Sequence, residues 1–197
     1  LFSPNGNFNF GLIKFVEQFE KLKWFNFIKE INKKNFKNIS DIKMTAKYWI
    51  EAQERIIIED NYNFFYNFFK THSLNASLDD NKFTNTKLTS GVIYITRDPR
   101  DVAVSFAKHR GEKIDSIIDF MINPGSMFPF DNERIPTILS RWDYHYISWK
   151  KIDVPKIIIK YEDLINDPKK NILKIKKFLS SELKIQIDID DQKVKNI

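Results

Sequence analysis

Two short runs of consecutive apolar residues stand out along the chain. Residues 91–96 read Gly-Val-Ile-Tyr-Ile-Thr, and residues 157–160 are three isoleucines followed by a lysine. Unbroken β-branched and aromatic runs of this length are typical of strands that are buried on both faces of a sheet. Residues 64–70 are dense in aromatic side chains and predict another short buried strand.

Between these runs, apolar positions recur at the three- and four-residue spacing of amphipathic helices. Two helical segments also carry strong start signals, because Asp98-Pro99 and Asp167-Pro168 each place a capping carboxylate before a proline at the first helical position. The expected helices cover residues 10–31, 40–59, 98–110, 114–121, 136–150 and 167–179, and the expected loops cover residues 1–9, 73–90 and 122–130. Strands that alternate with helices predict an α/β fold, with a parallel sheet covered by helices on both sides.

The composition fits one globular domain and excludes several classes of protein. Of the 197 residues, 42% are hydrophobic and only 5 are glycine and 7 proline, which excludes a disordered or collagen-like chain. The absence of cysteine excludes disulfide scaffolds, thiol catalysis and iron–sulfur sites. No apolar run approaches the length of a membrane span, and a cytoplasmic protein is expected. The lysines behind the net charge of +6 are scattered, which favours a solvated surface over a nucleic-acid-binding stripe.

Polar residues follow each expected strand, where ligands bind in open α/β sheets. The three sets are residues 70–72 (Lys-Thr-His), 96–100 (Thr-Arg-Asp-Pro-Arg) and 161–163 (Tyr-Glu-Asp). If the strands are parallel neighbours, these sets converge on one edge of the sheet. Lys70, Arg97 and Arg100 would make that edge cationic, and the helix that begins at Asp98 would add its N-terminal dipole. We therefore expect an anion site, with phosphate as the first candidate and His72 beside it.

Each candidate side chain also fits a structural role when it is considered alone. Surface or core-edge positions would equally explain Lys70, His72, Arg97, Ser105 and Tyr161. The other two histidines, His109 and His145, lie on expected helices and are interpreted as structural. No metal is indicated, because the chain contains neither a His-Glu-x-x-His motif nor a carboxylate cluster at calcium-binding spacing. The glycines at positions 6 and 11 have Walker A spacing, but Leu-Ile follows them in place of Lys-Ser/Thr.

Three segments, in this order along the chain, resemble motifs of the sulfotransferases that use 3′-phosphoadenosine 5′-phosphosulfate (PAPS). Lys70-Thr71-His72 resembles the family's Lys-Thr-His segment. Residues 94–105, Tyr-Ile-Thr-Arg-Asp-Pro-Arg-Asp-Val-Ala-Val-Ser, resemble its 3′-phosphate-binding motif. Residues 160–164, Lys-Tyr-Glu-Asp-Leu, with Asp167-Pro168 after them, resemble its Tyr-Glu-Asp segment. The three together are far more specific than any one alone.

The resemblance implies a role for each candidate residue. Arg97 and Ser105, eight positions apart, would hold the 3′-phosphate of PAPS, and Tyr161 would lie near the adenine. His72 would be the base that deprotonates a hydroxyl or amine acceptor, and Lys70 would steady the sulfonate oxygens or the leaving bridging oxygen. The fold implied is the family's P-loop NTPase-like three-layer sandwich, in which helices flank a parallel sheet. No metal is needed, and the acceptor would be a small molecule, a glycan or a lipid.

Two family segments have no counterpart, namely the phosphosulfate-binding loop and the C-terminal Arg-Lys-Gly segment. Since the first residue is Leu1, we expect residues 1–197 to be a single sulfotransferase domain that lacks its N- and C-terminal ends. The alternative is a non-catalytic nucleotide-binding fragment or pseudoenzyme, and a basic nucleic-acid-binding domain ranks lower. Residues 111–130, with Met121, Met127, Phe128 and Phe130, either flank an apolar acceptor pocket or pack as an ordinary loop.

Overall fold

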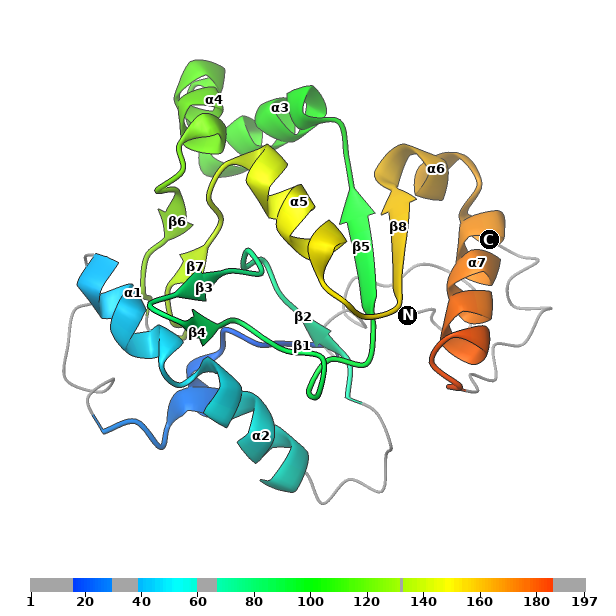
Figure 1. The fold of residues 1–197 in the computed structure, drawn as a ribbon. Coiled ribbons are helices and arrows are strands. Elements are labelled where there is room, and N and C mark those ends of the chain that lie inside the picture. Colours follow the sequence, from blue (N-terminus) through cyan, green and yellow to red (C-terminus); the bar gives the residue numbers. More distant parts are fainter. Residues whose placement is uncertain (1–15, 30–38, 60–66, 132, 186–197) are drawn as a thin grey trace.

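The computed structural model describes residues 16–29, 39–59, 67–131 and 133–185 as alternating helices and short strands (Figure 1). The strands are β1 (Glu17–Gln18), β2 (Phe69–Lys70), β3 (Ser77–Leu78), β4 (Asn81–Lys82), β5 (Val92–Thr96), β6 (Met127–Phe128), β7 (Thr137–Ile138) and β8 (Lys156–Lys160). The helices are the 3₁₀ helix η2 (Leu22–Phe25) and α1 (Ile39–Ala46), α2 (Trp49–Glu59), α3 (Pro99–Arg110), α4 (Ile114–Ile122), α5 (Trp142–Lys151), α6 (Tyr161–Asn166) and α7 (Pro168–Ser181).

Two pairs of strands are parallel, which confirms the expected α/β class. β5 and β8 pair along their whole length, with Val92 opposite Lys156 and Thr96 opposite Lys160. β1 and β2 form a second parallel pair. In the described part of the chain, β3 pairs with β4 and β6 with β7 as short antiparallel hairpins. α5 packs against β5 and α7 against β8, so helices accompany the central pair.

The helix starts follow the local signals in the sequence. The Asp98 carboxylate accepts a hydrogen bond from the backbone N–H of Arg100, and the Asp167 carboxylate accepts one from Lys170. Each proline then occupies the first helical turn, where its missing N–H costs no hydrogen bond. α3 ends at Gly111, whose φ of 67° is the left-handed conformation that favours glycine after a helix. α3, α4 and α7 therefore confirm three of the expected helices.

The helix expected over residues 10–31 is wrong wherever the structure describes it. Residues 16–29 instead form β1 and η2, and β1 pairs with β2 some fifty positions away in the sequence. The Trp24 Nε1–H donates to the carbonyl of Gln18, which folds this segment back on itself. Helical spacing of apolar residues alone did not reveal this pairing, because tertiary contacts override a weak local preference. The loop expected at residues 1–9 lies outside the described residues.

Other expectations hold only in part. The helix expected over 40–59 is divided into α1 and α2, and the helix expected over 136–150 begins only at Trp142 because residues 137–138 pair as β7. The expected loops over 73–90 and 122–130 contain β3, β4 and β6, and α6 was not expected. Of the buried strand expected over 64–70, residues 64–66 lie outside the described residues and residues 69–70 form β2, beside an exposed Phe68. The expectation that residues 91–96 and 157–160 are buried on both faces is wrong. Ile95 is 53% exposed and Ile158 is 36% exposed, because β5 and β8 pair only with each other among the described strands.

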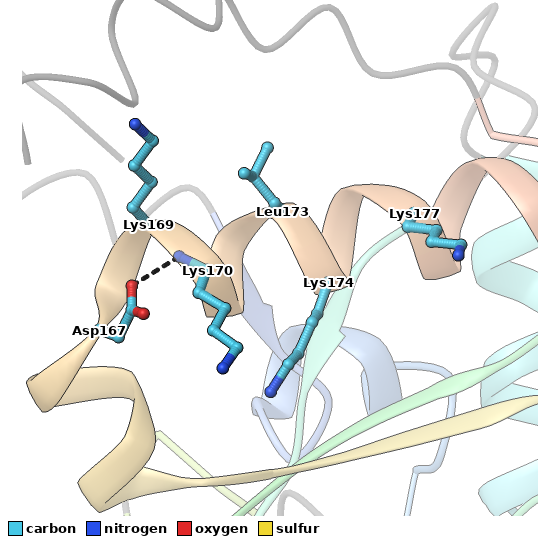
Figure 2. Close-up of a pocket in the computed structure, with 6 residues that line it drawn as sticks. All are labelled: Asp167, Lys169, Lys170, Leu173, Lys174 and Lys177. Carbon is cyan, nitrogen blue, oxygen red and sulfur yellow. Dashed lines mark hydrogen bonds between the residues drawn. The ribbon is translucent and has the colours of Figure 1, made fainter.

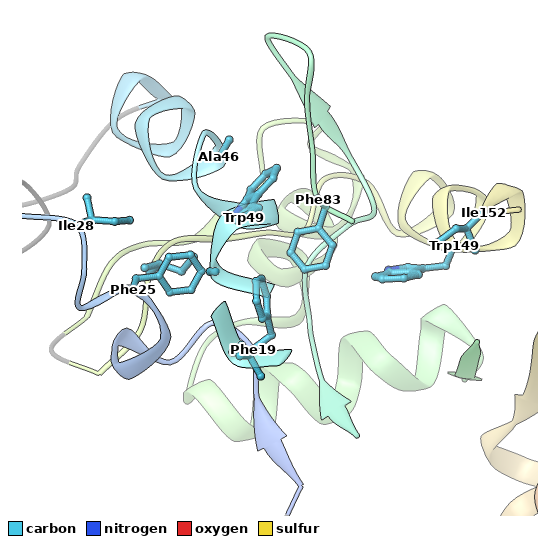
Figure 3. Close-up of a cluster of buried hydrophobic side chains, with 11 residues drawn as sticks. Phe19, Phe25, Ile28, Ala46, Trp49, Phe83, Trp149 and Ile152 are labelled. Carbon is cyan, nitrogen blue, oxygen red and sulfur yellow. The ribbon is translucent and has the colours of Figure 1, made fainter. Parts of the chain in front are cut away.

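The main core is a cluster of buried aromatic and aliphatic side chains, against which Val92 and Tyr94 of β5 pack (Figure 3). Phe83 lies at its centre and meets Phe19, Trp49 and Trp149 edge to face, with ring centroids 5.4, 5.3 and 5.9 Å apart. Such edge-to-face contacts add to the stabilisation from burial. Because Trp149 lies on α5 and Phe19 directly follows β1, this cluster holds the N-terminal segment and α5 in one unit.

Candidate functional site

The ends of β5 and β8 bring Arg97 and Tyr161 together. The two strands end level with each other, at Thr96 and Lys160, so the residues that follow them lie side by side (Figure 1). The Arg97 guanidinium carbon lies 4.7 Å from the centroid of the Tyr161 ring. Its Nε is buried and has no hydrogen-bond partner within the described ranges. Arg97 is thus held by a cation–π contact, and its N–H donors remain available to an anion.

The start of α3 lies beside this arginine and is tied to α6. The backbone N–H of Asp98 donates to Glu162 Oε1 at 3.2 Å, which joins the two chain segments that follow β5 and β8. Arg100 does not add to the cationic edge as expected, because its guanidinium pairs with Asp98, with Nε 2.9 Å from Oδ1. This pairing lowers the pKa of Asp98 to about 2. Arg100 is also 88% exposed on its side chain.

Ser105 lies farther along α3, seven residues after Asp98 and therefore about 10 Å along the helix axis. Its side chain is exposed. Positions 98, 102 and 105 share one face of the helix, since residues three and four apart are neighbours on a helix surface. Ser105 and Arg97, both within the described ranges, form no hydrogen bond with each other, so their joint binding of a phosphate stays a prediction.

The Lys-Thr-His segment is connected to the β5–β8 site through side chains and not through strand pairing as expected. β2, which ends at Lys70, pairs with β1 and not with β5 or β8 in the described sheets. Side chains make the connection instead. His145 on α5 lies between the two regions, with its Nε2 3.0 Å from the carbonyl oxygen of His72 and its Nδ1 2.9 Å from the hydroxyl of Tyr94 on β5. The expectation that three adjacent strands form one edge is therefore wrong, although His72 and β5 are linked.

The hydrogen bonds of His145 determine which ring nitrogen carries its proton. A carbonyl oxygen can only accept, so Nε2–H donates to His72 and Nδ1 accepts from the Tyr94 hydroxyl. Burial lowers the pKa of His145 below its usual value, which favours this neutral ring. Burial, together with the nearby Tyr146, raises the pKa of Tyr94 to about 12, which keeps its hydroxyl protonated. His145 was interpreted as structural from the sequence, and no local signal pointed to this contact across 73 positions.

The His72 side chain is exposed at the surface, but neighbouring protein atoms remove part of the water around its imidazole ring. The surrounding protein lowers the pKa of the imidazole most strongly, and the Lys70 ammonium lowers it further. The Glu20 carboxylate acts in the opposite direction. A lowered pKa leaves the ring neutral near pH 7, and a neutral imidazole can accept a proton.

The segment proposed as a flank of an acceptor pocket packs against α3 and the main core. Phe106, Phe120 and Phe128 form one aromatic group with centroid separations of 5.9 to 6.1 Å. Met121 packs onto the small cluster between α3 and α4, and Phe130 packs onto the main core. Of the two readings of residues 111–130, these contacts favour ordinary packing.

A separate hollow of about 430 Å³ lies along α7, and none of the predicted site residues lines it (Figure 2). Four lysines, at positions 169, 170, 174 and 177, line it together with Asp167 and Leu173. In the described ranges, no group of three or more His, Cys, Asp or Glu side chains is placed to hold a metal ion. None of the helices searched there is long and apolar enough to cross a membrane.

Comparison with known proteins agrees with the three motifs. The profile of the sulfotransferase domain family matches residues 12–197, so the chain belongs to this family. Among solved structures, mouse sulfotransferase SULT7A1 in complex with PAP is similar at 26% sequence identity, with a TM-score of 0.39. That match covers 53% of this chain and 35% of the mouse chain, about a third of its length. No curated protein sequence matches significantly.

Proposed function

We propose that the protein binds PAPS and transfers its sulfuryl group to a hydroxyl or amine acceptor, with residues 1–197 acting as one domain. The observation that carries the proposal is the Arg97 guanidinium, which stacks on Tyr161 and has a buried Nε without a partner in the described structure. Buried polar groups are normally hydrogen-bonded, so an unpaired charged donor at the end of two parallel strands is well suited to bind an anionic ligand.

Three residues would bind the donor nucleotide. Arg97 offers a planar fork that matches the oxygens of a 3′-phosphate, and the N-terminus of α3 adds partial positive charge next to it. Ser105 would add a hydroxyl to the same phosphate from the exposed face of α3. Tyr161 would keep Arg97 oriented and offer its ring edge to the adenine.

Two residues would act on the acceptor. PAPS supplies an activated sulfuryl group when bound, so the protein mainly has to orient the acceptor and offset charge. His72 would take the acceptor's proton on its neutral imidazole as the acceptor oxygen or nitrogen attacks. Lys70 lies two residues earlier, at the end of β2, and would offset negative charge there. The acceptor would be a small molecule, a glycan or a lipid.

The test of donor binding is calorimetric titration with adenosine 3′,5′-bisphosphate, the desulfated product. Arg97→Ala should weaken binding by about 10- to 100-fold, because hydrogen bonds to charged groups contribute about 1.5–3 kcal/mol and each 1.4 kcal/mol is tenfold. Arg100→Ala is the matched control, because it removes the same charge three positions after Arg97. The Arg100 side chain is exposed to solvent and pairs with Asp98.

Three results would contradict parts of this proposal. Wild-type protein that does not bind the bisphosphate would overturn the donor assignment. An equal loss in both arginine variants would show that Arg97 acts only through long-range charge. His72→Ala should retain bisphosphate affinity and lose acceptor-dependent turnover of PAPS, measured with phenols, sugars and hydroxylated lipids as acceptors. Binding without turnover in the wild type would identify a nucleotide-binding protein that transfers nothing.

A further inference from the structure

The turn that carries His72 is fastened by a buried carboxylate from a distant part of the chain. Glu20 is fully buried, with 0% of its surface exposed. Its Oε1 accepts hydrogen bonds from the Thr71 hydroxyl, from the His72 backbone N–H at 3.3 Å and from the Ser73 backbone N–H at 3.2 Å. One oxygen atom therefore fixes three consecutive residues, with the histidine in the middle.

The opposite side of this turn is fixed as well. The carbonyl of His72 accepts from His145, and the carbonyl of Ser73 accepts from the Trp149 indole N–H at 2.9 Å. Both of these donors lie on α5, which packs into the main core through Trp149. The backbone around His72 is thus held between Glu20 on one side and α5 on the other.

Glu20 is itself held rigidly. The preceding residue, Phe19, donates its backbone N–H to the carbonyl of Lys70 at 3.0 Å and packs in the aromatic core. The carbonyl of Glu20 accepts from the backbone N–H of Ile135 at 2.9 Å. Because Glu20 is fixed by the core, it can hold residues 71–73 in a fixed position relative to the core. A group that orients a reacting side chain must itself be held in this way.

Burial of the Glu20 carboxylate reduces the free energy of unfolding, so stability alone does not explain this residue. Its second oxygen, Oε2, is buried and has no hydrogen-bond partner among the residues that the structure describes. Removing a carboxylate from water is expensive unless all its oxygens are paired, and an apolar side chain would fill the same space without that cost. Glu17, three positions earlier, shows the contrast, because it is only half-buried and its two oxygens pair with Lys21 and Lys23.

We propose that Glu20 is a positioning residue for His72, which holds the 71–73 turn in one conformation and sets the electrostatic environment of the imidazole. This inference rests on the proposed function, in which His72 accepts the proton of the acceptor. Four titratable or charged groups act electrostatically on the pKa of the His72 ring, namely Lys70, Glu20, His145 and Arg134. Of these, Glu20 alone raises the pKa of His72, while the other three lower it.

The test uses Glu20→Gln, with Glu17→Gln as the matched control. The glutamine oxygen can still accept from the turn, but the negative charge is lost. NMR titration of the His72 ring should show a lower pKa in Glu20→Gln and an unchanged pKa in Glu17→Gln. Acceptor-dependent turnover should fall at least tenfold in Glu20→Gln, with less than a twofold change in affinity for adenosine 3′,5′-bisphosphate. A role only in stability would leave the His72 titration and the turnover of the folded protein unchanged.

Thr71→Val provides a second test if Glu20→Gln does not fold, because it removes one donor to Glu20 and keeps the shape of the side chain. It should shift the His72 ring resonances and reduce turnover several-fold at constant bisphosphate affinity. Wild-type resonances and turnover in Thr71→Val, or an unaltered His72 titration in folded Glu20→Gln, would overturn the inference. The titration does not depend on activity, so failure of the proposed function would appear separately, as a wild-type protein that does not bind the bisphosphate.

Discussion

Tyr94→Phe tests the link between β5 and the His72 turn with very little change in shape. The substitution keeps the ring, which packs against Tyr146 and His145 with centroid separations of 5.7 and 5.9 Å. It removes only the hydroxyl that donates to His145 Nδ1. The imidazole then loses one of its two hydrogen bonds and keeps the one to the carbonyl of His72.

The size of the effect follows from the burial of the group that is left unpaired. His145 is half-buried, so Nδ1 cannot fully replace the lost donor with water. Leaving a buried acceptor unsatisfied costs about 1–3 kcal/mol, and for a chain of this length each 1 kcal/mol lowers Tm by about 2–4 °C. Tyr144→Phe on the same helix is the control, because Tyr144 is 49% exposed and should change the free energy of unfolding by less than about 0.5 kcal/mol.

The assay is urea denaturation at pH 8, followed by circular dichroism and analysed by linear extrapolation. Tyr94→Phe should lower the midpoint with an unchanged slope, and Tyr144→Phe should behave like the wild type. If both variants have the wild-type midpoint, the hydroxyl of Tyr94 does not stabilise His145, and the reasoning about its tautomer is refuted. A loss of the same size in both variants would show that the effect is a general one on the helix.

Two further predictions concern pH and the joint between α6 and α7. The lowered pKa values of His72 and His145 mean that the unfolded state, with histidines near 6.5, takes up protons first as the pH falls. Stability should therefore be full above about pH 6.5 and decline below it, through the lowered folded-state values, so a Tm that stays constant from pH 7.5 to 5 would contradict the shifts. Asn171→Ala should cost about 1–3 kcal/mol in urea denaturation, because this side chain is 2% exposed and donates to the carbonyls of Asp163 and Asp167 at 2.7 and 2.8 Å. A cost below about 0.5 kcal/mol would show that Asn171 does not stabilise the connection between α6 and α7.

The expectations that succeeded depend on signals that act within a few residues. Asp98 and Asp167 cap helices whose first turns follow immediately, and the geometry of a capping hydrogen bond involves only four consecutive positions. The apolar runs that became β5 and β8 are unbroken and β-branched, which suits an extended chain. The family motifs also pointed to Arg97 and Tyr161. The structure brings this pair into contact, and their roles in binding stay predictions.

The expectations that failed depend on contacts between distant residues. Residues 17–18 form a strand only because residues 69–70 are available to pair with them. The helical spacing of Phe19 and Leu22 did not indicate this pairing, because the same two residues fit an amphipathic helix as well as they fit the observed turn and 3₁₀ helix. The same limit applies to Ile95, whose exposure depends on which strands lie beside β5 and not on its own side chain.

The amino-acid sequence alone therefore determined the α/β class, the family motifs and the starts of α3 and α7, since their signals lie in neighbouring residues. Only the tertiary structure decided that Glu20 and His145 fasten the turn of His72. These contacts span 52 and 73 positions, and they exist only after the aromatic core has brought β1 and α5 together. Hydrogen bonds of this kind have no local spacing, so no pattern along the chain predicts them.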